Sequence, residues 1–226
     1  MPIYGLGNIV PVFDCHGSVS SVGGTTSETS LYSKLIPGNT LGENGCLRIS
    51  INATFTNSAN SKVLKVKYGG TIFFTHSVAT QSVYKYAPIE IRNRNATNSQ
   101  VSDNGTAGGL GAATESIGSI DTTADQVLTI TGQTSLETGF AATSCTRASN
   151  VVTVNKTGHG LNTGEYAQVA GATPSTFDAD PVQITRVDAD NFTYSNTGAN
   201  ESTTVQPTIK RYSVCQINTV CVEVMR

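Results

Sequence analysis

The strict alternation of apolar and polar residues over residues 46–57 constrains the fold more than any other feature of this chain. The apolar members of the run CLRISINATFTN occupy every second position: Leu47, Ile49, Ile51, Ala53 and Phe55. The residues between them are polar: Arg48, Ser50, Asn52 and Thr54. Because successive side chains of a strand point to opposite faces, the run predicts a strand with one buried face and one wet face. Such one-sided burial is typical of an antiparallel sheet.

Similar strand patterns, separated by turn residues, recur along most of the chain. They cover residues 31–36, 62–68, 71–76, 83–95, 127–131 and 209–225. Charged residues make up only 13% of the chain, against about 25% in ordinary soluble domains, and β-branched and small polar residues take their place. We therefore expect an all-β protein, and the long connections favour an antiparallel jelly-roll sandwich.

A second set of shorter strand patterns interrupts this series near its end. Alternating runs occur at residues 152–154, 166–169, 182–187 and 192–194, and each is closed by a Gly, Asn or Asp turn. We interpret them as a small β-barrel-like module that is inserted before the last strand. The expected organisation is an N-terminal anchor and linker at 1–29, a jelly roll at 30–141 plus 207–226, and the inserted module at 142–206.

The first 29 residues are expected to attach the domain to a neighbour. Residues 1–14 are apolar, and residues 15–29, CHGSVSSVGGTTSET, have the composition of a flexible polar link. A frayed terminus or a first strand is the alternative interpretation. The candidate anchoring residues are the apolar ones: Ile3, Tyr4, Leu6, Ile9, Val10, Val12 and Phe13.

Charge and hydropathy argue against several classes of partner. The net charge of −2 provides no basic surface for nucleic acid. No apolar run reaches the roughly 20 residues that a membrane-spanning helix needs. The N-terminus lacks the basic start and apolar stretch of a signal peptide, so we expect synthesis in the cytosol and reduced thiols at that stage.

The cysteines are expected to be buried or inert thiols. There are five, and their spacing matches no zinc or redox motif: Cys15, Cys46, Cys145, Cys215 and Cys221. Cys215 and Cys221 lie six residues apart, so in a regular strand they would share one face, about 20 Å from each other. They are therefore not expected to form a disulfide with each other within one straight strand.

Histidines and acidic residues offer few candidates for chemistry. His159 lies between Gly158 and Gly160, which favours a turn over a general base or a metal ligand. Asp14, Cys15 and His16 are adjacent in the expected linker, where an extended chain would splay them apart.

The remaining acidic residues also favour turns over sites. Two pairs suggest a calcium loop at first sight but lack the EF-hand spacing: Asp178 with Asp180, and Asp188 with Asp190. Residues 188–191 are expected to form a hairpin turn. The separated Glu90, Glu115 and Glu137 provide no paired carboxylates for sugar hydrolysis. We expect no catalytic residues, no cofactor and no metal.

Aromatic residues leave one recognition role open. Four tyrosines could stack on sugars, although tyrosines in strands usually pack: Tyr84, Tyr86, Tyr166 and Tyr194. The chain has no tryptophan. In the Phe73-Phe74 pair, one ring is expected in the core and the other on the opposite face, where it could contact another subunit.

Residues 31–74, LYSKLIPGNTLGENGCLRISINATFTNSANSKVLKVKYGGTIFF, resemble a segment of tailed-bacteriophage virion proteins. The shared marks are the IPGNTLGENG turn, the NSANSK hairpin and the KVKYGGT strand end. The runs IEIRNRN and VLTITGQ continue the likeness to about residue 138, and the last strand completes it. The resemblance implies a trimeric jelly roll of the kind found in head fibres, decoration proteins and tail appendages.

Residues 150–196 resemble a small β-module of phage structural proteins. Its marks are VVTVNKTGHGLNTGEYAQVAG and VQITRVDADNFTYSNTG. In similar jelly rolls the chain passes directly from the turn near Gly132 to the last strand, and this chain departs from that pattern by its insertion.

Together these features lead us to expect a bacteriophage virion structural protein. The main expectation is a homotrimeric capsid decoration or cement protein on the head surface, bound to the major capsid protein or a neighbouring virion protein. The alternative is a tail fibre or spike component that binds a host-surface glycan.

Overall fold

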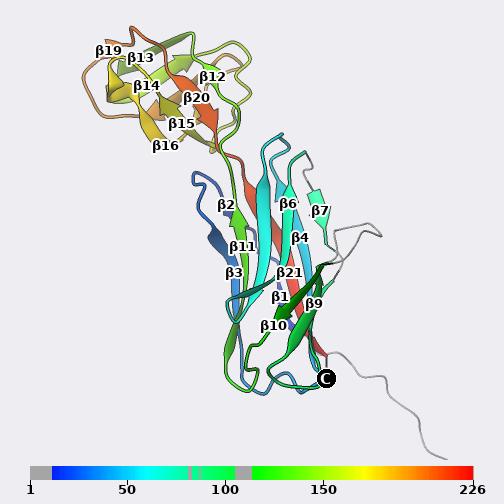
Figure 1. Ribbon diagram of the computed structural model, residues 1–226. Coiled ribbons are helices and arrows are strands. Elements are labelled where there is room, and N and C mark those ends of the chain that lie inside the picture. The colour runs from blue at the N-terminus through cyan, green and yellow to red at the C-terminus, as the bar shows by residue number, and fades with distance from the viewer. Residues whose placement is uncertain (1–11, 81–82, 87, 105–113, 226) are drawn as a thin grey trace, which may run out of the picture.

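The expected all-β fold is confirmed by the computed structural model, which describes residues 12–80, 83–86, 88–104 and 114–225 (Figure 1). Its ordered elements are antiparallel strands and one short 3-10 turn, η1 (Ser175–Phe177). The buried apolar residues form two separate clusters, one in a large lobe and one in a small lobe. None of the described helical elements is long and apolar enough to cross a membrane. The fold is thus an antiparallel β-sandwich with a second β-lobe, and the jelly-roll connectivity stays a prediction.

The first sheet of the large lobe follows the order β1-β21-β4-β8-β9-β10. In addition, β2 pairs with β21, and β7 pairs with β4. Its strands are β1 (Val12–His16), β2 (Ser20–Val22), β4 (Cys46–Phe55), β7 (Val83–Lys85), β8 (Ile89–Asn93), β9 (Gln100–Asn104), β10 (Thr114–Gly118) and β21 (Cys215–Met225). The long β4 and β21 pair along their whole length, and the last strand of the chain is an interior strand of this sheet, between β1 and β4.

The second sheet of the large lobe has the order β3-β11-β5-β6. Its strands are β3 (Thr29–Ile36), β5 (Lys62–Tyr68), β6 (Thr71–Val78) and β11 (Gln126–Gln133). The two sheets enclose the large cluster. The alternation expected in residues 46–57 is confirmed, because the apolar residues of β4 are at most 3% exposed while its polar residues point outward.

A β-bulge in β21 changes the expected orientation of the cysteines. Ile217 pairs with Ala53, but Thr219 pairs with the next residue of β4, Asn52, so one residue is inserted. An inserted residue reverses the side-chain alternation beyond it. Cys215 is therefore buried in the core and Cys221 lies on the outer face, so the expectation of a shared face is wrong.

The cysteines divide into one pair and three buried thiols. Cys221 forms a disulfide with Cys15 of β1, so the expectation that all five are free is wrong for this pair. Cys46, Cys145 and Cys215 are free and buried, and burial raises the pKa of the Cys215 thiol to about 12. These three behave as small apolar residues, as expected.

Neither ring of the Phe73-Phe74 pair is exposed. The register of β6 against β5 shifts next to these residues, so both rings turn into the core, where they are 0% and 3% exposed. Phe73 fits under β10 because Gly118 has no side chain there. The expected subunit contact through the second ring is therefore excluded by burial.

Part of the expected flexible link is structured. β1 and β2 both pair with β21, and Val22 is 4% exposed in the large cluster. The small polar residues of this stretch favour neither a strand nor a loop strongly. Residues 12–16 and 20–22 form strands because the free backbone N–H and C=O groups along one side of β21 pair with theirs.

The small lobe consists of two facing sheets with the orders β12-β20-β15-β16 and β17-β18-β14-β13-β19. The first contains β12 (Phe140–Ala141), β15 (Tyr166–Ala170), β16 (Ala179–Gln183) and β20 (Thr208–Arg211). The second contains β13 (Ser144–Ala148), β14 (Val151–Asn155), β17 (Thr185–Arg186), β18 (Asn191–Ser195) and β19 (Glu201–Ser202). Since β12 and β20 pair inside this lobe, the structure moves the expected boundaries of 142 and 206 outward to about 140 and 211.

The two lobes meet through a short set of polar contacts and one ring. Asn60 Nδ2 donates to the carbonyl of Leu136 at 2.7 Å, and Ser58 Oγ bonds Glu137 at 2.7 Å. Tyr166 of β15 packs directly on Gly24, which has a φ of +71° and where a Cβ atom would lie 2.9 Å from the ring. These contacts hold the connecting segments beside the end of the large lobe.

Candidate functional site

The structure places two of the seven candidate anchoring residues. Ile3, Tyr4, Leu6, Ile9 and Val10 lie outside the described residues, and Val12 and Phe13 begin β1. The half-buried Phe13 ring packs against the large cluster, and the Lys34 ammonium lies 5.7 Å from its centroid. Phe13 therefore serves the fold, whatever else it contacts.

β1 is fastened to both sheets of the large lobe. Tyr32 donates a hydrogen bond of 2.6 Å to Asp14, and Lys34 lies 3.6 Å from the same carboxylate. The Tyr32 bond, helped by Lys34, holds the pKa of Asp14 below its usual value, and burial raises the pKa of Tyr32. Cys15 is bonded to Cys221. His16 is hydrogen-bonded to Ser18 at 2.6 Å. Asp14, Cys15 and His16 thus each have a different bonding partner, and the described residues form no metal-binding group there.

The N-terminal segment and the small lobe are attached to opposite ends of the large lobe. Val12 pairs with Glu223 near the end of β21, so the chain enters the fold beside its C-terminal strand end. The small lobe leaves from the opposite end, where β11 finishes and β21 begins (Figure 1). The eleven residues of β21 separate these two ends by about 35 Å.

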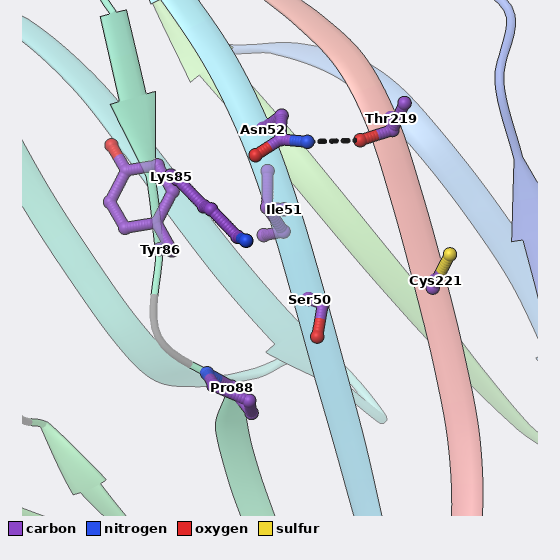
Figure 2. Close-up of a pocket in the computed structure, with 8 residues that line it drawn as sticks. All are labelled: Ser50, Ile51, Asn52, Lys85, Tyr86, Pro88, Thr219 and Cys221. Carbon is purple, nitrogen blue, oxygen red and sulfur yellow. Dashed lines mark hydrogen bonds between the residues drawn. The ribbon is translucent and has the colours of Figure 1, made fainter.

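A hollow lies on the outer face of the first sheet, over β4 and between β7 and β21 (Figure 2). It has a volume of about 550 Å³ and is lined by Ser50, Ile51, Asn52, Lys85, Tyr86, Pro88, Thr219 and Cys221. It forms because β7 pairs with β4 at residues 52–54 and β8 pairs with it at 46–49. The regular strand pairing is therefore interrupted beside residues 50 and 51.

The tyrosines considered for sugar stacking are mostly unavailable. Tyr86 and Tyr194 are each 2% exposed. Tyr84 is half-buried, and its ring stacks on Tyr86 at 5.6 Å and meets His76 edge-on at 4.8 Å. Tyr166 is 37% exposed but faces Gly24 of the large lobe. The four tyrosines therefore form no common platform.

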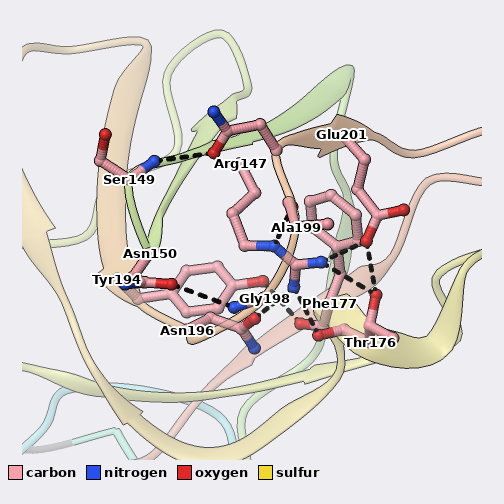
Figure 3. Close-up of polar contacts among 11 residues, drawn as sticks. Arg147, Ser149, Asn150, Thr176, Phe177, Tyr194, Asn196, Gly198, Ala199 and Glu201 are labelled. Atoms are coloured by element: carbon pink, nitrogen blue, oxygen red, sulfur yellow. Dashed lines mark hydrogen bonds and ion pairs between the residues drawn. The ribbon is translucent and has the colours of Figure 1, made fainter.

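Arg147 is buried in the small lobe and lies at the centre of a hydrogen-bond network (Figure 3). Its guanidinium donates to the carbonyls of Ala199 and Thr176 at 2.8 and 3.0 Å and to Asn196 Oδ1 at 2.5 Å. It also pairs with Glu201 and lies 4.7 Å from the centroid of the Phe177 ring. One side chain thus joins the loop at residues 196–201 to the turn at η1.

His159 and the acidic residues near it have structural roles. His159 is 7% exposed; its Nδ1 accepts from the Leu161 N–H at 3.0 Å, and its Nε2 lies 3.1 Å from the carbonyl of Asp188. Gly158 and Gly160 have φ of +62° and +67°, so the predicted turn is confirmed. Asp188 accepts from the N–H groups of Asp190 and Asn191 at 2.8 Å each, which confirms the predicted hairpin turn.

Sequence reasoning missed three features: the disulfide, the Arg147 network and the hollow. In β13, exposed and buried residues alternate, and Arg147 occupies a buried position. The occurrence of an arginine in the same alternating set as Cys145 is a sequence signal that could have identified it. The disulfide and the hollow depend on which strands become neighbours, and no local pattern reports that.

Comparisons with known proteins give little further information. No protein-family model and no curated protein sequence matches the chain. Among solved structures, the CBM2 module of an evolved Dit protein from Lactobacillus casei BL23 phage J-1 aligns at 12% identity. The alignment covers 82% of this chain and 68% of that chain, with a TM-score of 0.15. At that TM-score the likeness carries no argument about fold or function.

Proposed function

We propose that this chain is a bacteriophage virion structural protein that decorates or cements the head surface. One observation carries the proposal: the chain enters the large lobe at one end, and the small lobe leaves it at the other. A protein with this layout can be held at its N-terminal end while it displays the small lobe outward.

The interior of both lobes supports a structural role. The two clusters consist of buried apolar side chains. The buried Arg147 and His159 form hydrogen bonds with backbone carbonyls of loops. Glu90 is paired with Arg48 and Arg92, and Glu137 with Ser58. These carboxylates act as partners in the fold and do not face each other across a groove.

The resemblance of residues 31–138 to phage virion β-domains supports the proposal that the protein is part of a bacteriophage virion. In such an assembly the attachment is a sum of several weak contacts. Three-fold symmetry would let three N-terminal segments bind together, so that avidity exceeds the affinity of each by about 10²- to 10⁴-fold.

Removal of residues 2–11 is expected to abolish binding to phage heads while both lobes stay folded. The cut must end before Val12, because removal of all 29 residues would also delete β1, β2 and Cys15. Co-sedimentation with heads that lack the protein measures attachment, and circular dichroism checks the strands. As a matched pair, Ile9→Asp should weaken attachment and Asn8→Asp should not. Undiminished binding of the truncated chain would remove the anchoring role.

A trimer is the expected state in solution. The outer face of the sheet β3-β11-β5-β6 exposes Leu35 by 51% and Val127 by 41%, directly opposite each other, and Ile72 by 42%. We expect subunits to meet on this face, and obligate contacts of this kind bury about 2,000 Å² or more. Light scattering after size exclusion should give three times the monomer mass, and Val127→Lys should give monomers. Val205→Lys, on the small lobe, is the control; a monodisperse wild-type monomer at micromolar concentration would contradict the trimer.

A further inference from the structure

We propose that the hollow over β4 binds a saccharide unit that carries a carboxylate, such as a hexuronic acid. The hollow's volume of about 550 Å³ lies within the range of roughly 300–1,000 Å³ that small-molecule sites occupy. The site belongs to the large lobe, and it does not depend on where the protein sits on a particle.

Lys85 provides the charge for an acidic group. Its side chain reaches over β4 toward Ile51 (Figure 2), and the carboxylates of the described residues form no ion pair with it. None of the described residues that line the hollow is acidic. Two acidic residues of the same sheet, Glu90 and Glu223, are already paired, because both contact Arg48. An ammonium without a partner beside neutral polar groups favours an anionic ligand.

Hydroxyl and amide groups around Lys85 favour a ligand with several hydroxyls. Asn52 donates to Thr219 Oγ1 at 2.8 Å, which leaves the Asn52 Oδ1 atom as an acceptor toward the hollow. Ser50 Oγ has no hydrogen-bond partner among the described residues, so it can both donate and accept. A simple anion would use Lys85 alone, whereas a sugar acid also uses these groups.

The apolar part of the lining and its rigidity complete the site. Pro88 is exposed at the rim and offers an apolar surface to the C–H face of a sugar ring. The walls are held in place: the Tyr86 N–H donates to the Ile51 carbonyl at 2.9 Å, and Cys221 is bonded to Cys15. A preformed wall lowers the ordering cost that weak saccharide ligands must otherwise overcome.

Titration of the isotope-labelled protein with glucuronic acid, followed by backbone amide NMR shifts, tests the proposal. We expect millimolar binding with shifts at Ser50, Asn52 and Lys85, and much weaker binding of glucose, acetate and inorganic phosphate. Lys85→Gln should weaken glucuronate binding about tenfold, as expected for one charged hydrogen bond. Ser50→Ala should weaken it less, and Lys156→Gln, which removes a positive charge on the small lobe, should leave it unchanged.

Each other outcome overturns the proposal in a distinguishable way. Absence of shifts at tens of millimolar glucuronate would show that the hollow is not a site. Equal binding of glucose that is insensitive to Lys85→Gln would remove the acidic group from the ligand. Equal binding of acetate or phosphate would show an anion site without saccharide recognition.

Discussion

Replacing Arg147 by methionine will unfold the small lobe and leave the large lobe folded. The Arg147 side chain is 1% exposed, and its guanidinium serves two carbonyls, one amide oxygen and the Glu201 carboxylate. Methionine is unbranched like the arginine stem, but it is shorter and donates no hydrogen bonds, so these acceptors would lose their partner. Removing one member of a buried ionic network costs about 3–5 kcal/mol, which is comparable to the whole stability of a lobe of this size.

Hydrogen exchange followed by mass spectrometry separates the two lobes in the full-length chain. In the Arg147→Met variant, peptides from β13, β14 and β18 should lose protection, while those from β4 and β21 should keep it. Arg186→Met, on the exposed edge of the same lobe, should change little. Gly198→Ala should act in the same direction as Arg147→Met, because its Cβ would lie 2.4 Å from the guanidinium carbon. Unchanged protection in Arg147→Met would show that the loop is held by other contacts.

Loss of the Cys15–Cys221 disulfide will destabilise the large lobe by about 2 to 5 kcal/mol. The bond joins residues 206 apart in the chain, so it closes almost the entire polypeptide into one loop. Cross-links over long loops stabilise mainly by restricting the unfolded chain. The bond also fastens β1 to the central strand β21, so β1 should lose exchange protection first.

Denaturant unfolding of Cys15→Ser and of the wild-type chain, each with and without a reducing agent, measures this contribution. The two proteins should differ under oxidising conditions and coincide under reducing conditions, which is the internal control. Alkylation of the unfolded, unreduced wild-type chain should label three cysteines: Cys46, Cys145 and Cys215. Labelling of all five, or equal stability of the two proteins without reductant, would contradict the cross-link.

Local patterns predicted many of the strands and turns, because such patterns depend on neighbouring residues only. The alternation in β4 and the glycines around His159 each describe a short stretch whose conformation follows from side-chain burial or backbone freedom. The hairpin turn at Asp188 is of the same kind. The presence of a second lobe could also be predicted, since its strand patterns form a separate set of shorter runs near the end of the chain.

Most of the misjudged features involve residues whose partners are distant in the chain, and the Phe73-Phe74 pair, turned inward by a register shift against the adjacent β5, is the exception. The strands β1 and β2 form in a stretch with linker composition because β21 offers them an unpaired edge. The outer boundaries of the small lobe depend on the pairing of Phe140 with Ile209. The bulge after Ile217 exists only in the register of β21 against β4, and no residue type announces it.

The sequence by itself determined an all-β chain with two sets of strands, because periodicity and turn chemistry are local properties. Only the tertiary structure decided which cysteines meet, which arginine is buried in the small lobe, and where a hollow forms beside Lys85. These features arise from pairing between strands that are far apart in the chain. Which strands pair, and in which register, depends on all the other strands that are available as partners. A single stretch of sequence does not contain that information.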